Sequence, residues 1–323
     1  MWIQLSHNDL DGIGCIILGR YAQQKSAHPV SYNANSKYSF ENITNRLFSD
    51  KELVNKLSGV LVTDINLTEE LYNSLRTKIR EDTRVVLFDH HKNSLRHVDN
   101  GSNTTLHVDE SICATQLMFN SIRDKVDVDK YSSVVNAINA FDVWELDSSS
   151  YAVDLQRTYH WEVFMNPDKK YVKFPNKVLA YTDLIYNDPP TETYKPKWYE
   201  HALAQYNKVA EPLVENAMSN VFVKDGIHIF SFAQYDNTPT FEVGLRTQRN
   251  GVNDIVYIFN EPSRFVLSVR TGSENGIDLS NLATKFDGGG GHESAASFSV
   301  ANSETDLKNA LETVFQYYKE AKT

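Results

Sequence analysis

Cysteine is scarce in this chain, because Cys15 and Cys113 are the only two thiols among 323 residues. Two thiols cannot form the disulfide framework of a small secreted protein, so we expect a reducing compartment and place the chain in the cytoplasm. Long hydrophobic runs are missing too, since no apolar stretch approaches the ~18–20 residues that a helix needs to cross a bilayer. The segment MWIQLSHNDLDG at the start lacks the basic and apolar regions of a secretory signal, and we expect no association with membranes.

Positive charge is also in short supply. The 32 Lys and Arg residues are outnumbered by 42 Asp and Glu residues, which gives a net charge of −10. A protein that coats long nucleic acid needs a broad basic surface, so we expect no binding of long duplexes. A short anionic substrate is compatible with this charge, because bound metal ions and a few arginines can make a site locally positive. The hydrophobic content of 41% is typical of globular proteins, and the length favours two domains.

Short apolar runs alternate with amphipathic segments as far as about residue 185. The run RVVLFDHH (84–91) is almost continuously apolar before its charged end, as buried strands of parallel sheets are. Strand–helix alternation of this kind predicts an α/β fold with a parallel sheet and helices on both of its faces. The expected strands are 1–6, 59–65 and 84–91, and the expected helices are 11–25, 68–81, 111–122 and 130–144.

The rest of the chain forms a second pattern. Residues 186–197 contain three prolines, which is typical of a hinge, and a helical pattern follows over 198–220. Beyond it we expect strands at 220–232, 240–248, 253–260 and 264–272, a short helix at 278–286, and a final helix from Glu304. We therefore predict a catalytic domain over residues 1–185, a linker and connecting helix over 186–219, and a smaller α/β domain over 220–323.

Aspartates and histidines gather where the expected strands and helices of the first domain end. A single aspartate at such a position is most often a helix cap or a turn residue. Several carboxylates that meet at the carboxyl edge of one parallel sheet would repel one another unless cations neutralise them. Two divalent metal ions with carboxylate and imidazole ligands solve this problem, and phosphate esters are the natural substrates of two-metal hydrolases. The residues concerned are His7, Asp9, Asp11, Asp64, Asp89, His90, His91 and Asp142.

These motifs resemble those of the DHH phosphoesterase superfamily, which is named for the triplet that stands here as Asp89-His90-His91. The carboxyl-terminal part is similar to the associated DHHA1 domain, whose Gly-Gly-Gly-His signature appears as Gly289-Gly290-Gly291-His292. The segments occur in the family's order over nearly the whole chain. Within the superfamily, the motif sequence HNDLDG (7–12) and the length of the chain most resemble those of oligoribonucleases of the nanoRNase type, which degrade short RNAs and dinucleotides.

The resemblance implies a role for each residue of the motifs. His7 and Asp9 would hold one metal ion, Asp11, His90 and Asp142 would hold the other, and Asp64 would bridge the two. Asp89 would orient a histidine and His91 would face the substrate phosphate, so these two are the expected catalytic residues. Oxygen and imidazole ligands without thiolates favour Mn²⁺, with Mg²⁺ as the alternative. The two ions would activate a hydroxide for in-line attack on a phosphodiester.

The resemblance assigns substrate binding to the second domain, with the active site in the cleft between the two domains. Arg270 can grip a phosphate with two parallel hydrogen bonds. The backbone N–H groups of Gly289, Gly290 and Gly291 can form an anion-binding nest, and His292 follows them. Arg246, Arg249, Arg264 and Lys285 are further candidates for binding the phosphates of a short chain.

The sequence therefore predicts a metal-dependent phosphodiesterase that hydrolyses short single-stranded oligonucleotides or dinucleotides to nucleoside monophosphates. Two alternatives stay open: a phosphodiesterase of cyclic mono- or dinucleotide signals or a pAp phosphatase, and a nucleotide-binding sensor without turnover. The intact set of acids and histidines argues against the sensor. The sequence does not distinguish a monomer from a homo-oligomer.

Overall fold

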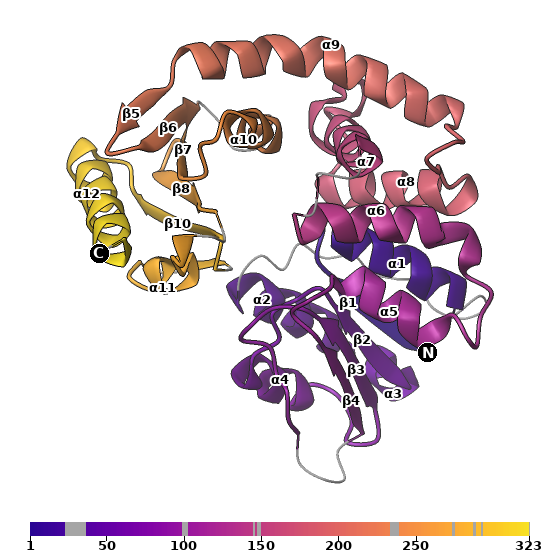
Figure 1. Cartoon of the computed structure of the whole chain (residues 1–323). Coiled ribbons are helices and arrows are strands. Elements are labelled where there is room, and N and C mark those ends of the chain that lie inside the picture. The colour runs from indigo at the N-terminus through magenta and orange to yellow at the C-terminus, as the bar shows by residue number, and fades with distance from the viewer. Residues whose placement is uncertain are drawn as a thin grey trace. The chain divides into compact units, whose positions relative to one another are not determined.

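The computed structural model describes residues 1–22, 37–98, 103–144, 146, 150–232, 239–272, 275–286, 289–291 and 293–322. The chain forms two compact units, Met1–Tyr206 and Asn207–Thr323 (Figure 1). The division falls within the long helix α9 (Lys197–Ser219), which the sequence assigns to the connection between the domains. The predicted domain limits at 185 and 220 stay predictions. No helix in the described ranges is long and apolar enough to cross a membrane.

The first unit is built on a four-stranded parallel sheet. Its strands are β1 (Trp2–Ser6), β2 (Gly59–Thr63), β3 (Arg84–Asp89) and β4 (Thr104–Val108), in the order β1-β2-β3-β4. The register pairs Ser6 with Thr63 and Thr63 with Phe88, so the carboxyl ends of the first three strands lie level with one another. The predicted strands are present. The structure adds β4, whose sequence TTLHV lacks the apolar run that marks the others.

Helices cover both faces of this sheet, as the alternation predicts. Alternate strand residues point to opposite faces, so Val60 and Val62 belong to one hydrophobic core and Leu61 to the other. Figure 1 shows α1 and α5 on one face and α2 and α4 on the other. The helices are α1 (Leu10–Ala22), α2 (Lys37–Phe48), α3 (Lys51–Lys56), α4 (Glu69–Arg76), α5 (Ala114–Ile122), α6 (Ser132–Asp142), α7 (Ser150–His160) and α8 (Phe174–Asn187), with short turns at Asp129–Tyr131, Trp161–Met165 and Pro167–Lys169.

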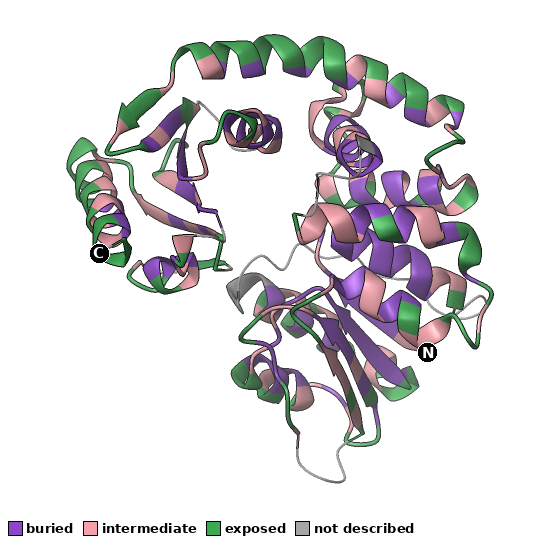
Figure 2. Ribbon diagram, viewed as in Figure 1, coloured by how far each residue is buried: buried purple, intermediate pink, exposed green. Residues whose placement is uncertain are grey.

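Helix α1 is buried on every side from Leu10 to Gly19, and Figure 2 shows it among the most buried elements of this unit. It is enclosed because it contacts β1 as well as the neighbouring helices α5, α6 and α8. A helix with no solvent face cannot shift without disturbing the core around it. Asp9 and Asp11, the first acidic residues of the chain, therefore lie at the start of a rigid helix.

The second unit holds a six-stranded mixed sheet. Its strands are β5 (Phe222–Lys224), β6 (Ile227–Phe232), β7 (Ile255–Asn260), β8 (Arg264–Arg270), β9 (Gly290–Gly291) and β10 (Ala295–Ala301), in the order β5-β6-β7-β8-β10-β9. Only β6 and β7 pair in parallel among these described strands. Helices α11 (Leu279–Ala283) and α12 (Glu304–Ala321) lie close to the predicted positions.

The strand predicted at 240–248 is wrong, because these residues form the helix α10 (Thr240–Arg249). Phe241, Val243 and Leu245 do alternate with other residues, which is also a strand pattern. Strands β6 and β7 run parallel, however, and two parallel neighbours must be joined by a crossover, which is usually a helix. Helix α10 supplies that crossover and buries Val243 in a core with Phe230 and Tyr257. Topology therefore overrides a local strand pattern here.

The glycine run before β10 contributes close packing. A Cβ atom on Gly289 would lie 2.2 Å from the carbonyl oxygen of Ala283 at the end of α11. The N–H of Gly289 also donates a hydrogen bond to the carbonyl of Phe286 at 3.1 Å. A side chain at this position would force the strand and the helix apart. By contrast, a Cβ atom on Gly290 would have no neighbour within 4 Å.

We expect Gly289→Ala to lower the free energy of unfolding by about 3 kcal/mol, since the new methyl group overlaps backbone atoms that cannot yield easily. Gly290→Ala is the matched control and should change the free energy of unfolding by less than ~0.5 kcal/mol. Urea unfolding followed by circular dichroism would measure both. Equal stability of the two variants would contradict the packing role of Gly289.

Candidate metal centre

The loop between β1 and α1 brings the first histidine and aspartate together. Asp9 begins α1: its Oδ1 accepts a hydrogen bond from the N–H of Gly12 at 3.0 Å, as an N-cap does. A Cβ atom on Gly12 would lie 2.1 Å from the carbonyl oxygen of His7, so the tight turn requires glycine. Within this turn, Nδ1 of His7 lies 2.7 Å from Oδ2 of Asp9. Their pairing is therefore fixed by the backbone.

Asp11 lies inside the buried helix α1, and its carboxylate is held by the start of α5. Its Oδ2 accepts the N–H of Ala114 and its Oδ1 accepts the N–H of Thr115, both at 2.8 Å. The hydroxyl of Thr115 also donates to the backbone carbonyl of Asp11 at 2.5 Å. The carboxylate oxygens of Asp11 thus satisfy two of the N–H groups that the start of α5 leaves without a partner in the helix. Asp11 is thus fixed in orientation by residues that are remote from it in the sequence.

Asp64 follows β2 and occupies the centre of the cluster. Its φ of 53° lies in the left-handed region, which non-glycine residues adopt only at a cost, and its N–H donates to the carbonyl of Phe88 at 2.9 Å. Its Oδ2 lies 3.5 Å from Nδ1 of His7, and its Oδ1 lies 3.5 Å from Nε2 of His90. The strained backbone therefore directs one carboxylate between two histidines.

His90 connects Asp64 to two further acids. Its Nε2 also lies 4.0 Å from Oδ2 of Asp11, and its Nδ1 lies 3.4 Å from Oδ2 of Asp142. Asp142 is the last residue of α6, so the cluster collects side chains from the ends of β1, β2 and β3 and from a helix. The structure thus brings together all six residues that the sequence assigns to the metal ions: His7, Asp9, Asp11, Asp64, His90 and Asp142.

Asp89 has a different environment. It is fully buried, its Oδ1 lies 2.7 Å from Nδ1 of His91, and its Oδ2 accepts a hydrogen bond from the hydroxyl of Ser94. Ser94 in turn accepts the N–H of Leu67 at 3.1 Å. Both oxygens of Asp89 are engaged, which suits a residue that orients His91. Ser94 is not among the residues predicted from the sequence, although it stands three residues after the triplet.

The electrostatics of the cluster show an excess of negative charge. Burial, together with the charges of Asp9 and Asp11, raises the pKa of Asp64 to about 6. Burial and the charge of Asp11 raise the pKa of Asp142 well above its usual range. Burial alone would lower the pKa of His90, but the hydrogen bond to Asp64 and the surrounding carboxylates raise it to about 11. The raised pKa values mean that protons bound to these side chains offset part of the negative charge of the cluster. Bound cations could offset the same charge.

The residues fit divalent cations. Three groups of residues could each hold an ion, because the ligand atoms within each group lie within 4.8 Å of one another. The groups are His7, Asp9 and Asp64; Asp11, His90 and Asp142; and Asp64, His90 and His91. Oδ2 of Asp64 and Oδ2 of Asp142 are buried without a hydrogen-bond partner in the described part of the chain, which is costly unless a cation binds them. Burial raises the pKa values of the thiols of Cys15 and Cys113, so the donors are oxygen and imidazole nitrogen.

Several of the residues predicted to bind substrate in the second unit already have partners within that unit. Nη1 of Arg270 donates to the hydroxyl of Ser268 and to the carbonyl of Val269, both at 2.9 Å. Gly290 and Gly291 pair with β10, and Gly291 has a φ of 149° that favours glycine. Gly290 and Gly291 are therefore part of the sheet edge, and an anion nest stays a prediction. His292 lies outside the described residues.

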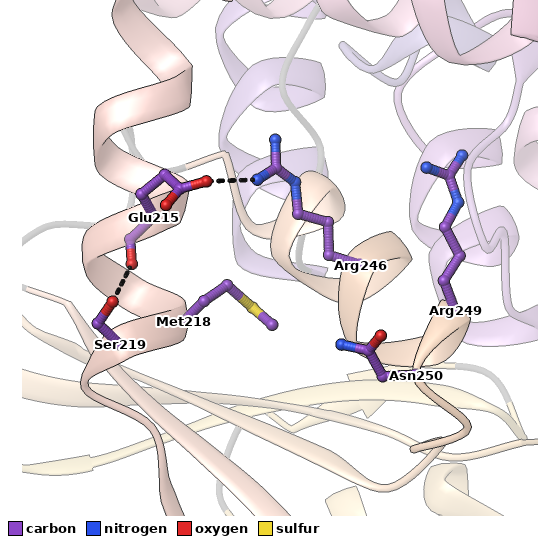
Figure 3. Close-up of a pocket in the computed structure, with 6 residues that line it drawn as sticks. All are labelled: Glu215, Met218, Ser219, Arg246, Arg249 and Asn250. Atoms are coloured by element: carbon purple, nitrogen blue, oxygen red, sulfur yellow. Dashed lines mark hydrogen bonds and ion pairs between the residues drawn. The ribbon is translucent and has the colours of Figure 1, made fainter.

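Of the other basic candidates, Arg246 and Arg249 line a shallow pocket between α9 and α10 (Figure 3). Arg246 forms ion pairs with Glu211 and Glu215 of α9. These carboxylates offset its charge, so Arg246 is poorly suited to a phosphate. Arg264 is likewise paired with Glu261 at 2.8 Å.

We expect Asp11→Ala to be less stable than Asp142→Ala by about 3 kcal/mol in protein freed of metal with a chelator. Both changes relieve repulsion among the carboxylates, but only the first leaves the buried N–H groups of Ala114 and Thr115 without their charged acceptor. Urea unfolding of the two variants would measure the difference. Equal stabilities would show that the start of α5 does not depend on Asp11.

Comparison with known proteins agrees with this architecture. Residues 230–320 match the DHHA1 domain family. The chain is 23% identical to oligoribonuclease NrnB of Bacillus subtilis (strain 168), over 95% of this chain and 75% of that protein.

Solved structures show the same fold. The pGpG-specific phosphodiesterase PggH from Vibrio cholerae is 13% identical, covers 99% of this chain and all (100%) of its own, and superposes with a TM-score of 0.57. RecJ from Thermus thermophilus, solved in complex with Mn²⁺, is 12% identical over 99% of this chain and 52% of its own, also with a TM-score of 0.57. With the DHHA1 match over residues 230–320 and the Asp-His-His triplet at the end of β3, this shared fold makes the chain similar to phosphoesterases of the DHH/DHHA1 superfamily.

Proposed function

We propose that the protein is a metal-dependent phosphodiesterase that hydrolyses short oligonucleotides and linear dinucleotides to nucleoside monophosphates. The observation that carries this proposal is the position of Asp64, whose buried carboxylate lies 3.5 Å from His7 on one side and 3.5 Å from His90 on the other. A carboxylate between two sets of ligands suits a residue that bridges two cations. A structural aspartate would have both oxygens hydrogen-bonded, whereas Oδ2 of Asp64 has no hydrogen-bond partner among the described residues.

Two divalent ions are proposed, held by the residues that the sequence assigns. His7 and Asp9 would bind one ion, and Asp11, His90 and Asp142 would bind the other, with Asp64 shared. The donor set favours Mn²⁺ over Mg²⁺ because of its imidazoles. When bound, such ions lower the pKa of water and offset the negative charge of a phosphodiester.

The protein's own contribution to the chemistry centres on His91. Burial lowers the pKa of His91, but the charge and hydrogen bond of Asp89 outweigh this and raise it. With Nδ1 bound to Asp89, Nε2 of His91 is the atom that would donate a proton to an oxygen of the substrate phosphate. Ser94 would keep Asp89 in the position that this orientation requires.

The proposed substrate class rests on the site and on two relatives. One is an oligoribonuclease and the other a pGpG-specific phosphodiesterase. For this chain, we propose a short single-stranded oligonucleotide or a linear dinucleotide, with Arg270, Gly289, Gly290, Gly291 and His292 as the residues of the second unit that bind it. Cytoplasmic location stays a prediction.

Purified wild-type protein with Mn²⁺ should release monophosphates from an RNA dinucleotide faster than it acts on cyclic dinucleotides, cAMP or pAp, and a chelator should stop the reaction. Asp64→Ala and His90→Ala should reduce turnover more than about a thousandfold, ~4 kcal/mol in transition-state stabilisation, while the circular dichroism spectrum is kept. His201→Ala is a matched control, because His201 is exposed on α9 and belongs to none of the ligand sets.

Near-normal turnover in either the Asp64 or the His90 variant would overturn the metal assignment. A preference for a cyclic substrate or for pAp would keep the metal site and change the substrate. Tight nucleotide binding without any hydrolysis would indicate the sensor.

The stabilisation of the fold by Mn²⁺ should grow as the pH rises from about 4 to 7. Asp64 has a folded pKa of about 6, above its ordinary value, so in metal-free protein its contribution to stability is complete below its unfolded pKa and is lost as the pH rises through 6. A bound cation favours the ionised form of Asp64. The stability of the metal-free protein therefore falls as the pH rises through 6, while the stabilisation by Mn²⁺ increases. Thermal unfolding with Mn²⁺ at a hundred times its Kd should show about 2.7 kcal/mol of stabilisation near pH 7. A difference independent of pH would contradict carboxylate ligation.

A further inference from the structure

Trp144 stands two residues after Asp142, just beyond the end of α6, and it is unusual in two ways. It is a large aromatic residue that keeps 41% of its surface exposed. Its φ of 61° lies in the left-handed region. Neither property suits a tryptophan whose only role is structural.

The backbone conformation would favour a different residue. The N–H of Val143 donates to the carbonyl of Asn139, and the N–H of Trp144 donates to that of Phe141 at 3.2 Å, so Trp144 follows the last turn of the helix. Glycine or asparagine usually occupies a left-handed position that ends a helix, because a larger side chain is strained there. Strained residues that persist are concentrated at functional sites.

The side chain is nevertheless held in place. The ring of Trp144 meets that of Phe141 edge to face, with centroids 5.7 Å apart and an angle of 67°. Phe141 packs against the larger hydrophobic core of the first unit. The indole is therefore an exposed surface supported by a core residue, which is the arrangement of a stacking platform.

We propose that Trp144 stacks on a base of the nucleotide substrate while the adjacent phosphate lies at the acid–histidine cluster. This inference rests on the proposed function. Two residues of extended chain span at most about 7 Å, so Trp144 and Asp142 lie within the length of one nucleotide. Tyr171, Tyr194 and Phe222 are other exposed aromatic residues, but their segments contribute no ligand to the cluster. Stacking reads no hydrogen-bond pattern, so the platform would accept any base and prefer the larger purines.

The test uses the full chain with Mn²⁺, a 5′-phosphorylated RNA dinucleotide of adenine, and two analogues in which either base is replaced by hydrogen. Trp144→Ala should raise KM for the dinucleotide about tenfold with a much smaller change in kcat. Trp144→Phe should restore most of the affinity. Both should leave KM nearly unchanged for the analogue that lacks the stacked base. Tyr171→Ala, which removes an 88% exposed ring elsewhere in the same unit, is the control and should behave as wild type.

Trp144→Gly separates a binding role from a structural one. Glycine adopts the left-handed conformation without strain, so this variant should keep or raise the Tm while it shows the same increase in KM. A fall in Tm with parallel loss of kcat on every substrate would assign Trp144 to the fold and overturn the inference. Unchanged KM in Trp144→Ala would also overturn it. Failure of the wild-type protein to hydrolyse any of the dinucleotides would instead count against the proposed function.

Discussion

Repulsion among buried carboxylates is the constraint on which the first unit depends. The parallel register places the ends of β1, β2 and β3 level, and the chain sets acids at this edge and at the end of α6. Without cations, the cluster balances its charge by holding protons, as the raised pKa values of Asp64 and Asp142 show. The same arrangement that makes the fold costly suits divalent cations, which would neutralise these carboxylates.

The scaffold holds each acid by a different physical means. Asp11 is fixed by the first amides of α5, Asp89 by the hydroxyl of Ser94, and Asp64 by a left-handed backbone. The left-handed backbone of Asp64 costs stability that the surrounding core must offset, whereas the buried hydrogen bonds of Asp11 and Asp89 satisfy both of their partners. The fully enclosed helix α1 supplies part of that support. Acids and histidines held this rigidly would need little rearrangement to bind the proposed metal ions.

In the second unit, several residues that the motifs assign to phosphate binding also take part in packing and ion pairs. Glycines in a row suggest a loop that binds anions, but Gly289 is needed where α11 approaches the chain, and its two successors pair with β10. Arg246 suggests a phosphate contact, but two glutamates of α9 offset its charge. Packing and ion pairs of this kind involve residues that only the fold brings together, so no local sequence pattern predicts them.

The sequence by itself determined the class of the fold, and it predicted a two-part organisation and the set of residues that the structure brings together in the candidate centre. It could do so because runs of buried strand residues and acids at strand ends are local patterns. It did not determine the helix α10, since the parallel pairing of β6 and β7 decides that segment, nor the edge strand β4, whose residues are only partly buried. Tertiary structure alone decided that Asp11 is bound by α5, that Ser94 holds Asp89, and that Trp144 is exposed in a strained conformation. The physical reason is that hydrogen-bond partners and solvent exposure arise only when distant segments pack together.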